Sequence, residues 1–147
     1  MDAVTLLIED HRRMKKLLKE LDHTTERGIK IRGELFAAIR AELVAHESIE
    51  EEIFYPALKE HPKAKDIVLE GIEEHHVVDG IVAELDVLPV TDETWGAKAT
   101  VMRENVEHHM EEEETDMFKK ARSVLSEEEL HELGERMESR KRELLGT

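Results

Sequence analysis

Two short motifs in the sequence combine side chains that bind metal ions. His46-x-x-x-Glu50 and His109-x-x-x-Glu113 each place an imidazole and a carboxylate four residues apart, which is about one turn along the same face of a helix. The chain has nine His and 36 Asp and Glu but no Cys, so a metal ion would be bound through nitrogen and oxygen. These ligand types favour iron, manganese or zinc.

The same residues interrupt the apolar stripes of four predicted helices. A buried carboxylate without a partner costs several kcal/mol, and six such polar side chains would cancel most of a typical stability of about 5–15 kcal/mol. Bound cations would compensate, and two carboxylates able to bridge favour a pair of ions. A hydrogen-bonded polar layer without metal is the alternative. The six side chains are His11, His46, Glu50, His75, His109 and Glu113.

The helices that must hold these side chains are predicted from apolar spacing and from capping residues. Asp2 is a candidate cap for the first helix, and Pro56 is expected to kink the second. Asp92 is expected to cap the fourth, while Ser126 and Glu129 form a predicted capping box for a fifth. The predicted helices cover approximately residues 2–24, 29–59, 64–85, 93–122 and 126–145.

These elements predict an all-α fold, namely an antiparallel up-down four-helix bundle with a short additional C-terminal helix. We expect a single domain over residues 1–147, with the bundle at about 2–122 and the C-terminal helix at about 126–145. The fifth helix is expected to cap the bundle or to form a dimer contact. The protein is therefore expected to be a monomer or a weak homodimer.

The composition excludes several classes of protein. At 147 residues the chain is long enough for one buried core, and 39% charged residues with only seven Gly and three Pro are typical of long helices rather than of a β-barrel. A formal net charge of −15 disfavours nucleic acids and anionic membranes as partners. No apolar run approaches the ~18 residues of a membrane span, and no signal peptide is evident, so the cytoplasm is the expected location.

The motifs resemble the hemerythrin-like family, whose HHE cation-binding domain is a four-helix bundle around a non-haem di-iron centre. The resemblance spans Thr5 to Arg122, and Leu130 to Met137 also resembles mycobacterial hemerythrin-like proteins. It implies two iron ions with a bridging oxo or hydroxo group, bound by the six side chains named above, with Glu50 and Glu113 as the bridging carboxylates. The matching motifs are Asp10 to Met14, His46 to Leu58, Glu74 to Val78 and His109 to Phe118.

Departures from that family bear on function. Oxygen-carrying hemerythrins have a His-x-x-x-His pair on the third helix, whereas here His75 is followed after four residues by Asp79. One imidazole is missing, so we expect reaction with a small oxidant such as O₂ rather than reversible O₂ carriage. The resemblance to the actinobacterial members of the family implies H₂O₂ or NO as the oxidant, including catalase-like decomposition of peroxide. The alternatives are an iron or oxygen sensor or storage protein without turnover, and a structural adaptor.

Leu43 and Val106 exclude the ferritin-like di-iron scheme, which requires Glu three residues before each histidine. Adjacent histidines also raise a question of register. His75 is favoured over its neighbour and His109 over its neighbour, because the rows through them are more apolar. The neighbours that remain as alternatives are His76 and His108.

Three further residues are open candidates. Asp79 could replace the missing imidazole as a ligand or as a hydrogen-bond acceptor behind one. Glu47 could ligate, although an exposed position is favoured for it. Tyr55 is expected to be an ordinary buried aromatic residue. The functional alternative is that its hydroxyl lies close to the metals without binding them, or that it is a redox partner.

Overall fold

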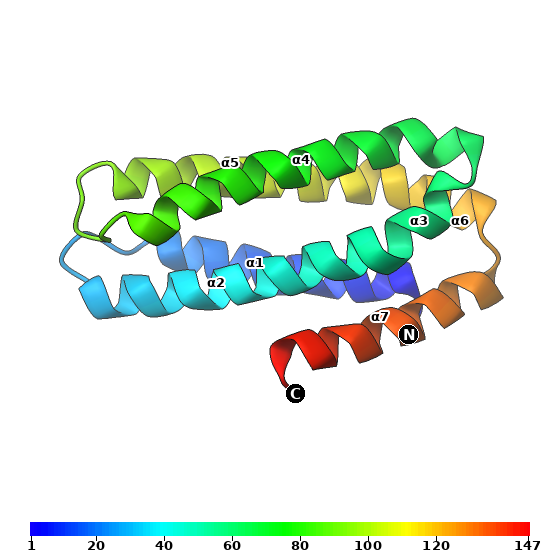
Figure 1. The fold of residues 1–147 in the computed structure, drawn as a ribbon, viewed down its shortest axis with the longest axis horizontal. Helices are drawn as coiled ribbons and strands as arrows, with labels where there is room; N and C mark the ends of the chain where they lie inside the picture. Colours follow the sequence, from blue (N-terminus) through cyan, green and yellow to red (C-terminus); the bar gives the residue numbers. More distant parts are fainter.

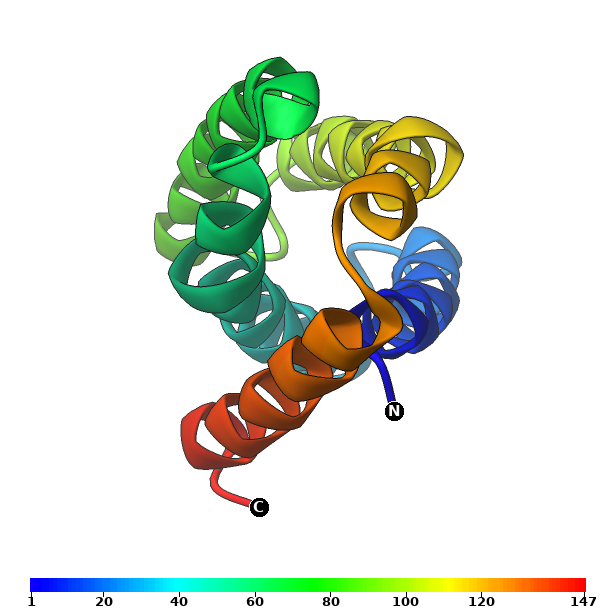
Figure 2. The ribbon, with the colours of Figure 1, turned by 90° about the vertical axis from the view of Figure 1, so that its right-hand side faces the viewer.

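Four long helical segments run antiparallel around a common interior, and a further helix lies against their outside (Figures 1 and 2). The computed structural model describes residues 1–147, and it confirms the predicted helical bundle. The second segment consists of α2, η1 and α3, and the fourth of α5, η2 and α6. The elements are α1 (Ala3–Asp22), α2 (Ile29–Ile49), η1 (Glu50–Phe54), α3 (Tyr55–Lys59), α4 (Pro62–Val87), α5 (Trp95–Glu112), η2 (Glu113–Met117), α6 (Phe118–Val124) and α7 (Glu127–Leu145).

Capping side chains fix where two of these helices, α1 and α7, begin. The Asp2 carboxylate accepts a hydrogen bond of 2.8 Å from the Thr5 amide, as predicted. Ser126 and Glu129 form the predicted capping box of α7. The prediction for Asp92 was wrong, because its carboxylate accepts from the backbone amide and hydroxyl of Thr94 and so folds the preceding turn. Thr94 takes the cap position of α5 instead.

Arg32 joins the two connections at one end of the bundle. Its guanidinium donates to the Thr24 hydroxyl and carbonyl, both at 3.1 Å, and to the Val90 carbonyl at 3.0 Å. It also lies 5.0 Å from the centre of the Trp95 ring. These partners compensate the burial of a charge that is only 7% exposed.

The apolar interior is divided into two clusters. One has 19 buried residues, includes Tyr55 and Phe118, and extends onto α7. The other has 13 buried residues and surrounds Trp95 near the opposite end. Along each long segment, the predicted polar side chains lie in the region where residues of one cluster give way to residues of the other. No helix has the length and apolar character needed to cross a lipid bilayer.

Helix α7 packs against its own chain, on α1, α2 and η1 (Figure 2). Leu130, Leu133 and Met137 bury their side chains in the larger apolar cluster. Gly134 lies so close to the backbone of Met1 to Ala3 that a Cβ atom would collide with it. Helix α7 therefore covers part of the side of the bundle, and a glycine permits its close approach.

We expect Gly134→Ala to lower the free energy of unfolding by about 1–3 kcal/mol, since the added methyl group meets backbone atoms that cannot rotate away. Gly80→Ala on α4 is the matched control, because an added Cβ there meets nothing within 4 Å. The control should be stabilised by about 0.4–1 kcal/mol. Chemical denaturation measures both, and an unchanged stability for Gly134→Ala would show that α7 moves outward without cost.

Candidate metal centre

All six side chains selected by the sequence pattern lie together in the layer between the two apolar clusters. Helices α1 and α4 contribute one each, and the second and fourth segments contribute two each. None is more than 8% exposed, although charged side chains are seldom buried without partners. They are His11, His46, Glu50, His75, His109 and Glu113.

The Nε2 atom of every histidine lies close to one or both of the buried glutamates. Glu50 lies near three of the rings and Glu113 near three, so each carboxylate spans the cluster. The shortest separations of Nε2 from a carboxylate oxygen are 3.1 Å from His11 to Glu113, 3.3 Å from His46 to Glu50, 3.0 Å from His75 to Glu50 and 3.5 Å from His109 to Glu113.

The Nδ1 atom of every histidine is paired with a different, outer carboxylate. An Nδ1–H that donates to a carboxylate fixes the tautomer in which Nε2 carries a lone pair, and the same pairing orients histidines that bind metals. The Nδ1–oxygen distances are 2.8 Å from His11 to Glu114, 3.0 Å from His46 to Asp10, 2.8 Å from His75 to Glu51 and 2.7 Å from His109 to Glu74.

The donor atoms fit metal ions in number and in type. Two buried atoms, His46 Nε2 and Glu50 Oε2, have no hydrogen-bond partner, although buried polar atoms in proteins nearly always have one. Two groups of ligand atoms, each within 4.8 Å, share Glu50. One group contains His11, His46, Glu50 and Glu113, and the other contains Glu50, His75 and His109.

Both segments that carry a His-x-x-x-Glu motif change from α-helix to π-helix at the glutamate. The Tyr55 amide donates to the Glu50 carbonyl, and the Phe118 amide donates to the Glu113 carbonyl, five residues back. Such π-turns occur frequently at functional sites. Pro56, expected to kink the second segment, lies in the first turn of α3 where a missing N–H is tolerated. Because η2 forms with no proline nearby, Pro56 alone does not explain the π-turn.

The bundle has two halves, one formed by α1, α2, η1 and α3 and the other by α4, α5, η2 and α6. The aromatic residue that follows each π-turn stacks on a histidine of the opposite half. Tyr55 lies 5.5 Å from the His75 ring and Phe118 lies 5.7 Å from the His11 ring. The Tyr55 hydroxyl also donates to Glu113 Oε2 at 2.7 Å. Gly71 makes room for that hydroxyl, since a Cβ there would lie 3.0 Å from it. Tyr55 is therefore both a packed aromatic residue and a hydrogen-bond donor to the cluster.

Protons compensate the buried carboxylates where no metal ion is bound. Burial opposes a charge on His109, but the charge of Glu113 and hydrogen bonds to Glu113 and Glu74 raise its pKa to about 11. Burial also opposes a charge on His46, yet the Glu50 charge holds its pKa well above the ordinary value. Burial raises the pKa of Glu113, but the charge of His109 and hydrogen bonds lower it well below the ordinary range. Metal ions that bind here must displace protons.

The structure buries His75 and His109 and exposes the histidines next to them. The His76 side chain is 59% exposed and pairs with Glu73, and the His108 side chain is 65% exposed. Asp79 is exposed and belongs to neither of the two inner groups. The two buried histidines are thus the ones that the more apolar rows favour.

Glu47 differs from its expected exposed position, because it is only 8% exposed. It follows His46 directly and lies beside Glu51 and His75, within reach of a shared ion. Burial, followed by a hydrogen bond with Asp79 and its charge, raises the pKa of Glu47 to about 10. A protonated carboxyl group therefore stands next to the centre in the metal-free protein.

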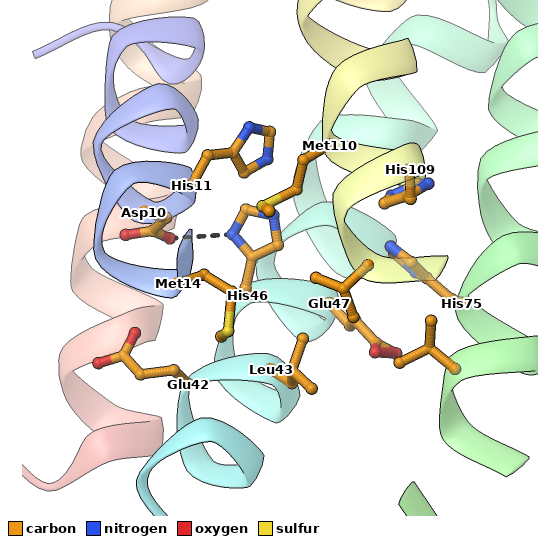
Figure 3. Close-up of a pocket in the computed structure, with 12 residues that line it drawn as sticks. Asp10, His11, Met14, Glu42, Leu43, His46, Glu47, His75, His109 and Met110 are labelled. Atoms are coloured by element: carbon orange, nitrogen blue, oxygen red, sulfur yellow. Dashed lines mark hydrogen bonds and ion pairs between the residues drawn. The ribbon is translucent and has the colours of Figure 1, made fainter. Parts of the chain in front are cut away.

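A small cavity opens beside the four imidazoles (Figure 3). Its volume is about 30 Å³, which is room for one or two molecules of the size of water. The rings of His11 and His46 lie on one side and those of His75 and His109 on the other (Figure 3). Apolar side chains complete much of the wall, and they are Met14, Leu43, Val78, Val106 and Met110.

Sequence reasoning missed the four outer carboxylates, although a signal for them exists. Each is the immediate neighbour of a predicted ligand, and each serves a histidine on a different segment. Acidic residues are so common in this chain that adjacency alone did not distinguish them. The adjacent pairs are Asp10-His11, Glu50-Glu51, Glu74-His75 and Glu113-Glu114.

Comparison with known proteins finds a matching family model, similar sequences and a similar solved structure. The family model described as the Hemerythrin HHE cation binding domain matches residues 2–121. The uncharacterized proteins Rv2633c of Mycobacterium tuberculosis and Mb2666c of Mycobacterium bovis are each 33% identical over 117 residues, covering 77% of this chain and 69% of theirs. The crystal structure of a Hemerythrin HHE cation binding domain-containing protein, the Rv2633c homolog from Mycobacterium kansasii, superposes with a TM-score of 0.87 at 28% identity. That match covers 99% of this chain and 88% of the other.

In the metal-free protein, we expect Tyr55→Phe to lower the free energy of unfolding by about 1.5–3 kcal/mol, because Glu113 loses a hydrogen bond to a buried charge. With metal ions bound, the Glu113 oxygens have other partners and the loss should be smaller. Denaturation of the chelator-treated and metal-loaded variant measures the difference. An equal loss in the two states would contradict a shared role of Glu113 in binding metal.

Glu47→Gln should become more stable relative to the wild type as pH rises. Because the folded pKa of Glu47 is raised from 4.5 to about 10, its stabilising contribution is complete below pH 4.5 and is lost as pH rises through 10. The advantage of the neutral glutamine should grow by up to about 1.4 kcal/mol per pH unit across this window. Metal-free protein is compared by denaturation at several pH values, with the exposed Glu104→Gln as control. A constant difference for Glu47→Gln would show that Glu47 is charged at neutral pH.

Proposed function

Since the chain belongs to the hemerythrin HHE cation-binding family, we propose that its buried cluster binds two iron ions that react with a small oxidant. Imidazole nitrogens and carboxylate oxygens suit iron, and two carboxylates that each lie within 4.0 Å of three of the histidines suit a pair of ions. Hydrogen peroxide is the oxidant for which we propose turnover, in a catalase-like reaction. O₂ and NO are proposed as further ligands.

Each of the six residues has a role in this proposal. The four histidines would hold the ions through Nε2, and Glu50 and Glu113 would hold them through their carboxylates. A solvent-derived oxo or hydroxo group would complete the cofactor. When bound, an iron pair supplies two-electron redox chemistry, which suffices to convert two H₂O₂ molecules to one O₂ and two H₂O.

The chain itself holds the ligands and limits what reaches them. Outer carboxylates such as Asp10 and Glu74 keep the Nδ1 protons in place, so that Nε2 stays available to the metal. The Tyr55 hydroxyl holds Glu113 from a side that does not line the cavity. Tyr55 is therefore a positioning residue here and not a group that contacts the oxidant.

The cavity is the observation that carries the choice of a small oxidant. Its roughly 30 Å³ admits H₂O₂ or a diatomic gas but no organic substrate. Its apolar side chains, together with the carboxylates of Asp10 and Glu42 in its lining, favour small neutral molecules over anions. With Asp79 exposed and no fifth imidazole in the cluster, six protein ligands leave positions for such a molecule, which favours reaction over reversible O₂ carriage.

Protein from iron-replete cells should contain about two irons per chain and show charge-transfer absorption of a bridged ferric pair. Added peroxide should release O₂. Glu113→Ala should abolish both iron binding and O₂ release, whereas the exposed Glu111→Ala should leave both intact. Iron-loaded protein that releases no O₂ but becomes protease-sensitive on iron removal would instead indicate a sensor. Protein that contains no metal after purification from iron-replete cells, and whose thermal stability does not change when iron is added, would contradict the metal centre itself.

Filling the cavity should separate metal binding from reaction. Val106 lines the cavity and is buried, so we expect Val106→Phe to keep two irons but to slow O₂ release by at least about tenfold. Val101→Phe on the same helix is the control, because Val101 is 47% exposed. Val106→Leu serves the same test if the larger side chain prevents folding. Full activity in both iron-loaded Val106 variants would show that oxidants do not use this cavity.

A further inference from the structure

Asp10 differs from the other three outer carboxylates in being buried. Its side chain is 4% exposed, compared with 30% for Glu114, 38% for Glu51 and 27% for Glu74. Its Oδ2 atom accepts the Nδ1–H of His46 at 3.0 Å (dashed line in Figure 3). A carboxylate removed from water in this way requires a partner of opposite charge.

That partner comes from outside the four-helix bundle. The Lys141 ammonium on α7 forms an ion pair with Asp10 Oδ1 and lies 3.5 Å from Glu42. Its side chain is only 13% exposed, so water screens this pair weakly. Arg13 also contacts Oδ1, but its side chain is 51% exposed. The two cations engage Oδ1 and leave Oδ2 directed at His46.

Lys141 lies beyond residues 2–121, the part of the chain that matches the family domain. Helix α7 is nevertheless held firmly, because Leu130, Leu133 and Met137 are buried in the larger apolar cluster. The helix therefore presents one lysine, at a fixed position, to the carboxylate behind one histidine. No comparable buried lysine or arginine pairs with Glu51, Glu74 or Glu114.

We propose that Lys141 is a positioning residue for His46, which it reaches through Asp10, so that docking of α7 and retention of the metal ion near His11 and His46 stabilise each other. The inference rests on the proposed metal centre but not on its reaction with oxidants. It makes the two metal positions inequivalent, because the group around His75 and His109 has no contact with α7 of this kind.

Lys141→Met tests this, since methionine keeps much of the apolar stem and removes the charge. Fe(II) is added anaerobically in competition with a chelator. We expect one of the two binding steps to weaken about three- to tenfold, less than the roughly 10–100-fold typical when a residue touching the ligand is lost. The other step should be unchanged. Lys141→Arg keeps the charge and should bind Fe(II) with the wild-type affinity. Arg140→Met is the control, because it removes only exposed ion pairs of α7, and it should not change the affinity.

Hydrogen exchange gives a second readout that does not depend on activity. Amides of α7 should gain protection when Fe(II) binds the wild type and should not gain it in Lys141→Met, because the coupling is reciprocal. Equal affinities for wild type and Lys141→Met, or loss of both steps together, would overturn the role of Lys141. A wild type that binds two Fe(II) ions without turnover would overturn the proposed reaction alone. A wild type that binds none would overturn both proposals.

Discussion

Two fully buried carboxylates dominate the organisation of this molecule. Glu50 and Glu113 are 0% and 1% exposed, and charge so far from water is tolerated only when other charges meet it. Four imidazoles supply this compensation, and each imidazole is in turn held at its Nδ1 atom by a second carboxylate. Protons or metal ions can satisfy the inner carboxylates, but apolar packing cannot. The remaining architecture places helices of suitable length and direction around this layer.

The centre has two halves of similar design that differ where they meet the rest of the chain. Each half has a π-turn starting at a glutamate and an aromatic ring stacked on a histidine of the opposite half. The hydroxyl of Tyr55 is present in one half only, because Phe118 takes the corresponding place in the other. The buried Asp10 carboxylate likewise has no equivalent among the outer acids. Two ions bound here would occupy different environments despite the repeated motif.

Much of the fold was predictable, because apolar residues at helical spacing and caps such as Asp2 and Ser126 act locally. The six inner side chains were predictable because each interrupts an apolar stripe. Details that depend on neighbouring segments were not. The burial of Glu47 involves its neighbours His75 and Asp79 on α4, and the π-turn at Glu113 has no marker residue such as proline. The direction of α7 depends on Gly134, whose close contact with the start of α1 spans most of the chain in sequence.

Because the apolar interior is divided into two clusters, apolar packing alone does not couple the unfolding of the two ends of the bundle. Side chains of the Trp95 cluster and of the Tyr55 cluster are joined through a polar layer, whose attraction changes with protonation and with bound ions. All-or-none melting requires that the two ends of a domain unfold as one unit. In this chain the charged layer joins the two ends together with the long helices that run through both clusters. The fluorescence of its single tryptophan reports directly on only one of the two ends.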